Sequence, residues 1–228
     1  MCFSATASFV AGGALSAAGV AVLRRARTRE RIPIASIPLI FGIQQLVEGV
    51  VWLSFGKPTL HVFATYLFTL FSHVFWPFYM PLAVMMIEPD PKRKKILGGF
   101  VIFGVSVSIY MLYYILKGPI TSEIVQSCIY YAVPYSDSYW LLAAYIVATC
   151  VGCFFSSHKY IRVFGLAVFG GLLISLWSYR FAFYSVWCFF AAILSLIIYL
   201  HLGPRKKLQE MADKTRVEIH KRLQRLPR

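Results

Sequence analysis

A carboxylate stands inside the apolar segment FGIQQLVEGVVWL, residues 41–53. Glu48 follows Gln44 by four positions and Gln45 by three. Trp52 comes four positions after Glu48. Residues three or four apart share one face of a helix, so a helix here presents two amides, a carboxylate and an indole N–H together. In a membrane such a face must point into the protein, where it can bind a small ligand, an ion or a proton.

A second polar face follows in the next apolar segment. Thr65, Thr69 and His73 recur every four positions. Trp76 and Pro77 come directly after them. Proline has no N–H, so the carbonyl of His73 loses its helical donor, and in a bilayer that carbonyl needs an internal partner or water. We therefore expect a kinked helix whose polar face is a companion to the first.

The composition excludes a water-soluble globule of this size. Of 228 residues, 59% are hydrophobic and only 14% are charged, whereas soluble domains carry about 25% charged residues. The formal net charge is +14, and the basic residues form short clusters between apolar segments. That distribution indicates a protein of the lipid bilayer with anionic lipids as partners, and it argues against nucleic-acid binding.

Seven apolar segments are long enough to cross a bilayer core, which takes about 20 helical residues. They predict an all-α integral membrane protein, a seven-transmembrane-helix bundle that occupies residues 1–202. The expected spans are 4–23, 33–55, 60–87, 96–116, 138–155, 160–178 and 181–202.

The basic residues predict the orientation of this bundle. Of the 23 Lys and Arg residues, 20 fall in loops of one side or in the tail, and only Lys57, Lys117 and Arg180 fall on the other side. Positive loops stay in the cytoplasm, so we expect the N-terminus outside and the C-terminus inside. Residues 203–228 are basic with apolar positions at helical spacing, which predicts an amphipathic helix on anionic lipids of the cytoplasmic face. A solvated tail is the alternative.

Two residues are candidate partners for Glu48. Arg180 is expected at the outer end of the last two spans, and Glu48 also belongs to the outer half of its span. A pair between the guanidinium and the carboxylate offsets much of the cost of burying the acid. His73 is expected deeper in the membrane. The alternative to a binding role is helix packing, because intramembrane amides and hydroxyls often join helices.

The metal-ligating residues are too dispersed to predict a metal centre. Catalytic zinc takes three protein ligands and an open position. Only His73 lies deep in a span, and His61 lies at the outer rim. Cys150 and Cys153 form a CVGC pair near a cytoplasmic end, where we interpret them as packing residues. The sequence thus leaves the metal and any cofactor undetermined.

The longest outer loop, residues 117–137, carries apolar residues and Cys128. We expect it either to fold over the outer face as a lid or to be a plain connector. Cys2 and Cys128 are the only cysteines expected outside the hydrocarbon, so one disulfide at most can form on an exposed face.

Five segments of the chain are distinctive: MCFSATASFVAGG, IPIASIPLIFGIQQLVEGVVWLSF, FWPFYMPLAVMMIEP, SSHKYIRVFG and SVWCFFAAILSLIIYLHL. Together they resemble a family of bacterial multi-span membrane proteins of unknown function. The resemblance extends over nearly all seven expected spans. It implies a multi-pass protein of the bacterial cell inner membrane, and it brings no activity.

These observations support three functions. The first is binding, transport or sensing of a small ligand, ion or proton through a polar outer-half pocket on spans two, three, six and seven, formed by the residues named above and Arg180. The second is a structural or assembly protein without a ligand. The third is an intramembrane metal-dependent lipid hydrolase, for which the dispersed histidines offer little support.

Overall fold

The computed structural model describes residues 4–135, 138–178 and 182–198, so Arg180 and the predicted tail helix 203–228 lie outside the described residues. The described chain is helical apart from one β-hairpin. Its elements are α1 (Ala5–Leu23), η1 (Arg29–Arg31), α2 (Ile32–Ser54), α3 (Pro58–Thr69), η2 (Leu70–Phe75), α4 (Trp76–Ile87), α5 (Pro91–Lys117), β1 (Thr121–Val125), β2 (Cys128–Ala132), α6 (Tyr139–Ile146), η3 (Val147–Val151), α7 (Gly152–Phe154), α8 (Lys159–Ser178) and α9 (Phe183–Leu194).

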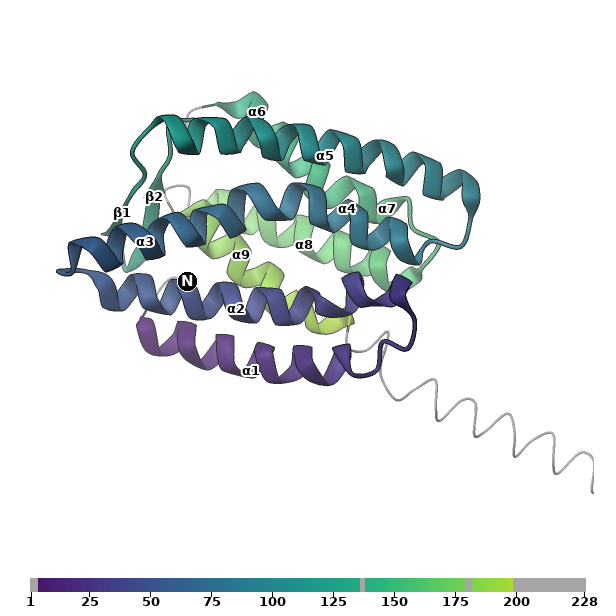
Figure 1. Ribbon diagram of the computed structural model, residues 1–228, viewed down its shortest axis with the longest axis horizontal. Coiled ribbons are helices and arrows are strands. Elements are labelled where there is room, and N and C mark those ends of the chain that lie inside the picture. The colour runs from purple at the N-terminus through teal and green to yellow at the C-terminus, as the bar shows by residue number, and fades with distance from the viewer. Residues whose placement is uncertain (1–3, 136–137, 179–181, 199–228) are drawn as a thin grey trace, which may run out of the picture.

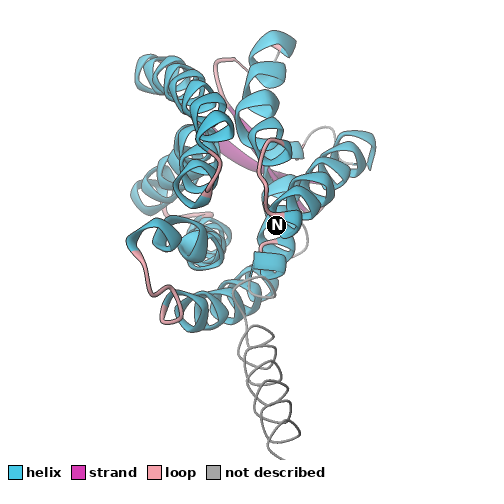
Figure 2. Cartoon of the chain, turned by 90° about the vertical axis from the view of Figure 1, so that its right-hand side faces the viewer, coloured by secondary structure: helices cyan, strands magenta, loops and turns pink. Residues whose placement is uncertain are grey.

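The long helices run side by side along the longest axis of the molecule (Figure 1). The β-hairpin lies at one end, which we call the hairpin end. The turn between α1 and α2 and the turn between α4 and α5 lie at the other, which we call the basic end because both turns carry Arg and Lys clusters. Seen from the basic end, the helices form a bundle, and the strands lie behind them (Figure 2).

The exterior of the bundle is apolar. Five helical stretches are long and apolar enough to cross a membrane. In the stretch Pro91–Lys117 only 28% of the most apolar window is buried, and Leu116 is 76% exposed. A soluble monomer seldom leaves so large an apolar face uncovered. The five stretches are Ala5–Leu23, Arg29–Ser54, Pro58–Ile87, Pro91–Lys117 and Lys159–Ser178, and shorter apolar helices cover Tyr139–Phe154 and Phe183–Ile198.

Glycine allows the closest contact between α4 and α5. A Cβ atom added at Gly104 would lie 2.0 Å from the carbonyl oxygen of Pro77. No side chain larger than hydrogen fits at that distance. The two helix backbones therefore meet beside the proline that follows η2.

The helical stretch that runs from α3 to α4 is interrupted where the sequence predicts a kink. Leu70–Phe75 forms a π-helical segment, η2, directly before Pro77. Ser108 of α5 donates its hydroxyl to the carbonyl of Val74 at 2.7 Å, and the Tyr145 hydroxyl of α6 donates to the carbonyl of Ser72. Carbonyls in and beside the break thus have side-chain partners from neighbouring helices, which lipid cannot supply.

The outer loop contains two strands that the sequence analysis did not predict. β1 and β2 pair in antiparallel fashion around Gln126 and Ser127, which both have positive φ, as a two-residue hairpin turn requires. Ser122 joins β1 to α3, because its hydroxyl lies 2.8 Å from that of Thr65 and its carbonyl 3.1 Å from Nε2 of His61. The hairpin is therefore fixed to the bundle.

The cysteine of the hairpin differs in redox state from the cysteines of the helices. Cys128, at the start of β2, is disulfide-bonded. Cys150, Cys153 and Cys188 are free thiols and are buried. Cys2, the remaining cysteine of the sequence, lies outside the described residues. Among the described cysteines, Cys128 is thus the one that takes part in a disulfide.

Candidate functional site

The polar face of α2 points into the bundle. Gln44, Gln45 and Glu48 are each 0% exposed. The Glu48 carboxylate accepts a hydrogen bond from the Ser185 hydroxyl of α9, with 2.5 Å between Oε1 and Oγ. Trp52, one turn further along α2, is half-buried beside a separate apolar group near the hairpin. The carboxylate therefore meets α9, and Trp52 packs against the apolar group that includes Phe68 and Tyr131.

The companion face also lies in the interior. Trp76 donates its indole N–H to Oε1 of Gln44 at 2.7 Å, so the two predicted faces are in direct contact. His73 is buried, and its Nδ1 lies 2.7 Å from the hydroxyl of Ser72. Thr69 is buried as well, but its hydroxyl donates to the Thr65 carbonyl one turn back. Thr69 thus completes its own helix and offers no donor to the site.

Helix α9 connects the two faces. Its Cys188 thiol lies close to Gln44 and Glu48. One turn earlier, the Tyr184 ring stacks at a tilt against His73, with 4.0 Å between centroids. From the hairpin, the Tyr131 hydroxyl is within electrostatic range of Glu48. Residues of α2, η2, α9 and β2 thus form one buried polar group, which we call the Glu48 cluster.

Sequence reasoning missed four members of this cluster. Ser185, Tyr184 and Cys188 lie in the segment FAFYSVWCFF, where hydroxyls and a thiol in an apolar run were the available signal. Tyr131 lies in the outer loop, and the pairing of β1 with β2 turns its ring inward against Phe68 at 4.4 Å. The other predicted partner of Glu48, Arg180, is outside the described residues.

Several buried polar atoms of this region have no hydrogen-bond partner among the described residues. They are Nε2 of Gln44, the amide oxygen and nitrogen of Gln45, Nε2 of His73 and the hydroxyls of Tyr131 and Tyr135. Leaving one such group unsatisfied costs about 1–3 kcal/mol. Unpaired buried donors and acceptors of this kind are what a site for a small polar occupant requires.

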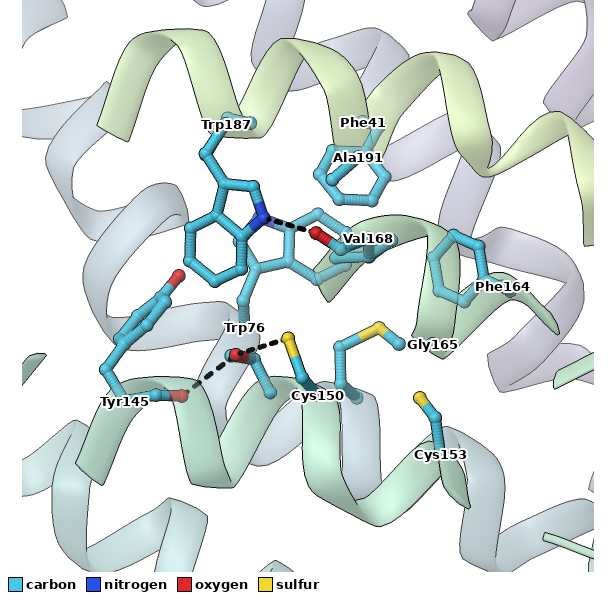
Figure 3. Close-up of a pocket in the computed structure, with 13 residues that line it drawn as sticks. Phe41, Trp76, Tyr145, Cys150, Cys153, Phe164, Gly165, Val168, Trp187 and Ala191 are labelled. Atoms are coloured by element: carbon cyan, nitrogen blue, oxygen red, sulfur yellow. Dashed lines mark hydrogen bonds between the residues drawn. The ribbon is translucent and has the colours of Figure 1, made fainter. Parts of the chain in front are cut away.

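The space beside the cluster is small. A cavity of about 30 Å³ lies between α2, α4, η3, α8 and α9 (Figure 3). Trp76 and Cys188 are among its lining residues, and Glu48 is not. Trp187 closes one side and donates its indole N–H to the Val168 carbonyl at 3.1 Å. One water needs about 10–15 Å³ by this measure, whereas organic ligands take roughly 300–1,000 Å³. The cavity is therefore too small for an organic ligand, and its walls are almost entirely apolar.

The predicted histidines and cysteines do not assemble into a metal centre. Within the described ranges, no three His, Cys, Asp or Glu side chains are grouped so that they could hold a metal ion. His61 contacts Ser54 at 2.8 Å and Ser122 at 3.1 Å. Cys150 and Cys153 line the apolar cavity instead (Figure 3). This part of the chain gives the hydrolase alternative no ligand set.

Comparison with known proteins identifies the family. The model of a family of unknown function, DUF6629, matches residues 1–214, and the chain belongs to that family. No curated protein and no solved structure matches it. The resemblance to an uncharacterised family is confirmed, and the family name brings no activity with it.

Proposed function

We propose that this member of the DUF6629 family is a seven-helix protein of the bacterial inner membrane that binds and passes a small cation, most simply a proton, at Glu48. The observation that carries the proposal is the buried Glu48 carboxylate, held by Ser185 and surrounded by polar atoms that lack partners. Transport and sensing are both outcomes of such binding.

The chain offers seven apolar helices for this topology. Five stretches have the required length, and the two shorter helices contain about 16 residues each, or about 24 Å at 1.5 Å per residue. A bilayer core of about 30 Å is thinned locally or met by flanking residues at such helices. The basic end then faces the cytoplasm, and the disulfide-bonded Cys128 at the hairpin end faces the oxidising periplasm.

This orientation puts Glu48 in the outer half of the bundle. Helix α2 starts at the basic end and finishes at Ser54, six residues beyond Glu48. Six residues correspond to about 9 Å of helix. A proton from the periplasm therefore has a short distance to cover, along the side of the bundle where the hairpin contributes Tyr131.

The size of the space favours a proton over a larger ligand. An ionised carboxylate in hydrocarbon is costly unless it is paired or takes up a proton. His73, Tyr184 and Cys188 are further members of the buried Glu48 cluster. In this proposal the polar pocket expected on four spans is this cluster of side chains.

Proton flux into liposomes tests the proposal. Purified protein is reconstituted with a trapped pH-sensitive dye, and a potassium diffusion potential drives protons inward. Wild type is expected to acidify the lumen faster than protein-free liposomes. Glu48→Gln, which keeps the shape and removes the titrating group, should reduce the rate to that of the empty liposomes.

Glu123→Gln is the matched control, because Glu123 is exposed on β1 and undergoes the same chemical change. It should keep the wild-type rate. Under the structural alternative, Glu48 only joins α2 to α9. Wild type would then show no flux above background, or Glu48→Gln would fold and retain full flux, and either result rejects the proposal.

A further inference from the structure

A second recess lies at the basic end, away from the Glu48 cluster. Its volume is about 500 Å³, within the range of sites for small organic molecules. Three separate parts of the chain form it: the start of α2 with the turn before it, the turn from α4 to α5, and the start of α8. The lining residues are Thr28, Glu30, Arg31, Ile34, Met86, Ile87, Glu88, Pro89, Lys94 and His158.

The walls of this recess are fixed by Glu88. The side chain of Glu88 is only 3% exposed. Its carboxylate accepts hydrogen bonds from the Ser157 N–H at 2.8 Å, the Ser157 hydroxyl at 2.5 Å and the Ser156 hydroxyl at 3.2 Å. His158 donates from Nε2 to the Ile87 carbonyl at 3.0 Å. The charge of Glu88 is therefore already compensated, and the carboxylate serves to hold α4 against the start of α8.

Two cationic side chains line the recess from different elements. Arg31 precedes the first residue of α2, and Lys94 lies in the first turn of α5; both are exposed. The side chain of Arg31 makes no capping hydrogen bond to α2. The partial positive charge of the helix N-terminus therefore adds to the charges of Arg31 and Lys94. Glu30 is the exposed carboxylate among the lining residues, and it is attracted to Lys94.

The lining also has an apolar part, which includes Ile34, Met86 and Pro89. A site lined by both cations and apolar atoms suits an anion that carries an organic group. Arg and Lys together are the usual protein ligands of phosphate. The recess also lies where α2 and α5 begin their apolar stretches, which is the depth of lipid headgroups in a membrane.

We propose that this recess binds a phosphate ester, with Arg31 and Lys94 on the phosphate and the apolar part of the lining beside the organic group. The ester comes either from the headgroup of an anionic lipid or from a soluble molecule of the cytoplasm. This inference is independent of proton binding at Glu48 and concerns the other end of the bundle.

Calorimetric titration of the full chain tests the site. The protein is placed in phosphatidylcholine nanodiscs and titrated with glycerol 3-phosphate. The double variant Arg31→Gln with Lys94→Gln should raise the dissociation constant by about tenfold or more, the factor expected for losing a charge-assisted hydrogen bond. Lys92→Gln with Lys95→Gln removes the same charge from the same end but outside the recess, and should change the constant little.

Glu30→Gln should lower the dissociation constant of glycerol 3-phosphate, whereas the Arg31 and Lys94 double variant should raise it. It removes the competing carboxylate and frees Lys94, so glycerol 3-phosphate should bind more tightly. Any of three results would overturn the proposal. Glycerol 3-phosphate could fail to bind wild type and every variant, the two double variants could weaken binding equally, or Glu30→Gln could bind it more weakly. All five substituted positions are exposed, so the fold is expected to survive.

Nanodiscs that contain phosphatidylglycerol distinguish the two sources. If the lipid headgroup is the ligand, wild type in these discs should lose its glycerol 3-phosphate binding, and native mass spectrometry should show phosphatidylglycerol retained by wild type and lost from the Arg31 and Lys94 double variant. If the ligand is soluble, titration should be unchanged in these discs. Either result supports a phosphate site, and retention of the lipid by both double variants contradicts the headgroup source.

Discussion

Glu48 is accommodated by polar neighbours that come from distant parts of the sequence. Ser185 is 137 positions away and supplies the hydroxyl that Oε1 accepts. The amide oxygen of Gln44 accepts from Trp76, whereas its Nε2 has no partner among the described residues. Gln45 and His73 also keep unpaired atoms in that part of the chain. At the residue scale, hydrogen bonds that hold the fold lie beside buried polar atoms that are open to an occupant.

Glu88 shows how the same residue type behaves at the basic end. Burial acts to raise its pKa, but the hydrogen bonds from Ser157, from the Asp90 N–H and from Ser156 outweigh burial and bring the pKa below its ordinary value of 4.5. The fold therefore stabilises the ionised form. That stability is present above the ordinary pKa and is lost as pH falls through the lowered one.

We accordingly expect Glu88→Gln to change how stability depends on pH. Wild type in detergent should lose thermal stability as the pH falls from about 5 to about 3, and the variant should lose less over that range, because glutamine does not titrate. Its melting temperature at neutral pH should be lower than that of wild type. Glu123→Gln on the exposed strand should follow the wild-type curve. Parallel curves for wild type and Glu88→Gln would contradict this interpretation.

The sequence predicted part of the candidate site for a physical reason. Helical spacing is local, so Gln44, Gln45 and Glu48 could be placed on one buried face, and the face of Trp76 could be paired with it. The contact with Ser185 depends on how α9 packs, which no local spacing encodes. The inward position of Tyr131 depends on strand register, since a shift of one residue would turn its ring away.

At the scale of elements, the break around η2 connects three helices. The π segment releases carbonyls, α5 and α6 satisfy those of Val74 and Ser72, and His73 lies between them. Gly104 lets α5 approach Pro77 closely enough for this arrangement. The sequence indicated the break through Pro77, but the donors Ser108 and Tyr145 became visible only in the packed helices.

Two glycines of α5 give a matched test of this contact. Gly104→Ala would place a methyl group 2.0 Å from the Pro77 carbonyl oxygen, so it should lower the free energy of unfolding by about 1–3 kcal/mol. Gly99→Ala meets nothing within 4 Å and should be neutral or stabilise by up to about 1 kcal/mol, because alanine favours helix. Denaturant unfolding in mixed micelles measures both. Equal effects would mean that α4 and α5 do not depend on this approach.

The hairpin is the element that the sequence analysis did not anticipate. Its strands are five residues each, and the region was expected only as a lid or a connector. Periodicity is weak over so few positions, and Ile124 faces outward at 50% exposure although it is apolar. The inward positions of Cys128 and Ile129 follow from contact with the bundle, which the sequence alone does not display.

At the scale of the whole molecule, charge and redox state distinguish the two ends. The basic clusters lie at one end and the disulfide-bonded Cys128 at the other. In the proposed topology the hairpin end is the outer one, and both features support that proposal. Composition was sufficient to predict long apolar helices that are compatible with a membrane, because the excess of apolar residues is a property of the entire chain.

Cysteine labelling in intact cells tests the orientation. Lys57→Cys lies at the hairpin end and Lys92→Cys at the basic end, and both positions are exposed. A membrane-impermeant maleimide should label the first in intact cells and the second only after lysis. The free thiols of the described chain are buried, so the background should be low. Labelling of Lys92→Cys in intact cells would show that the topology is the reverse of the proposed one.

The central claim is that Glu48 takes up and releases a proton while it is buried. Infrared difference spectroscopy of the reconstituted protein, recorded across a change from neutral to acidic pH, observes this event directly. Wild type and Glu123→Gln should both show the C=O band of a protonated carboxyl group in an apolar environment, and Glu48→Gln should lack that band. A folded Glu48→Gln protein that keeps the full band would show that Glu48 does not exchange the proton, and the account would be wrong.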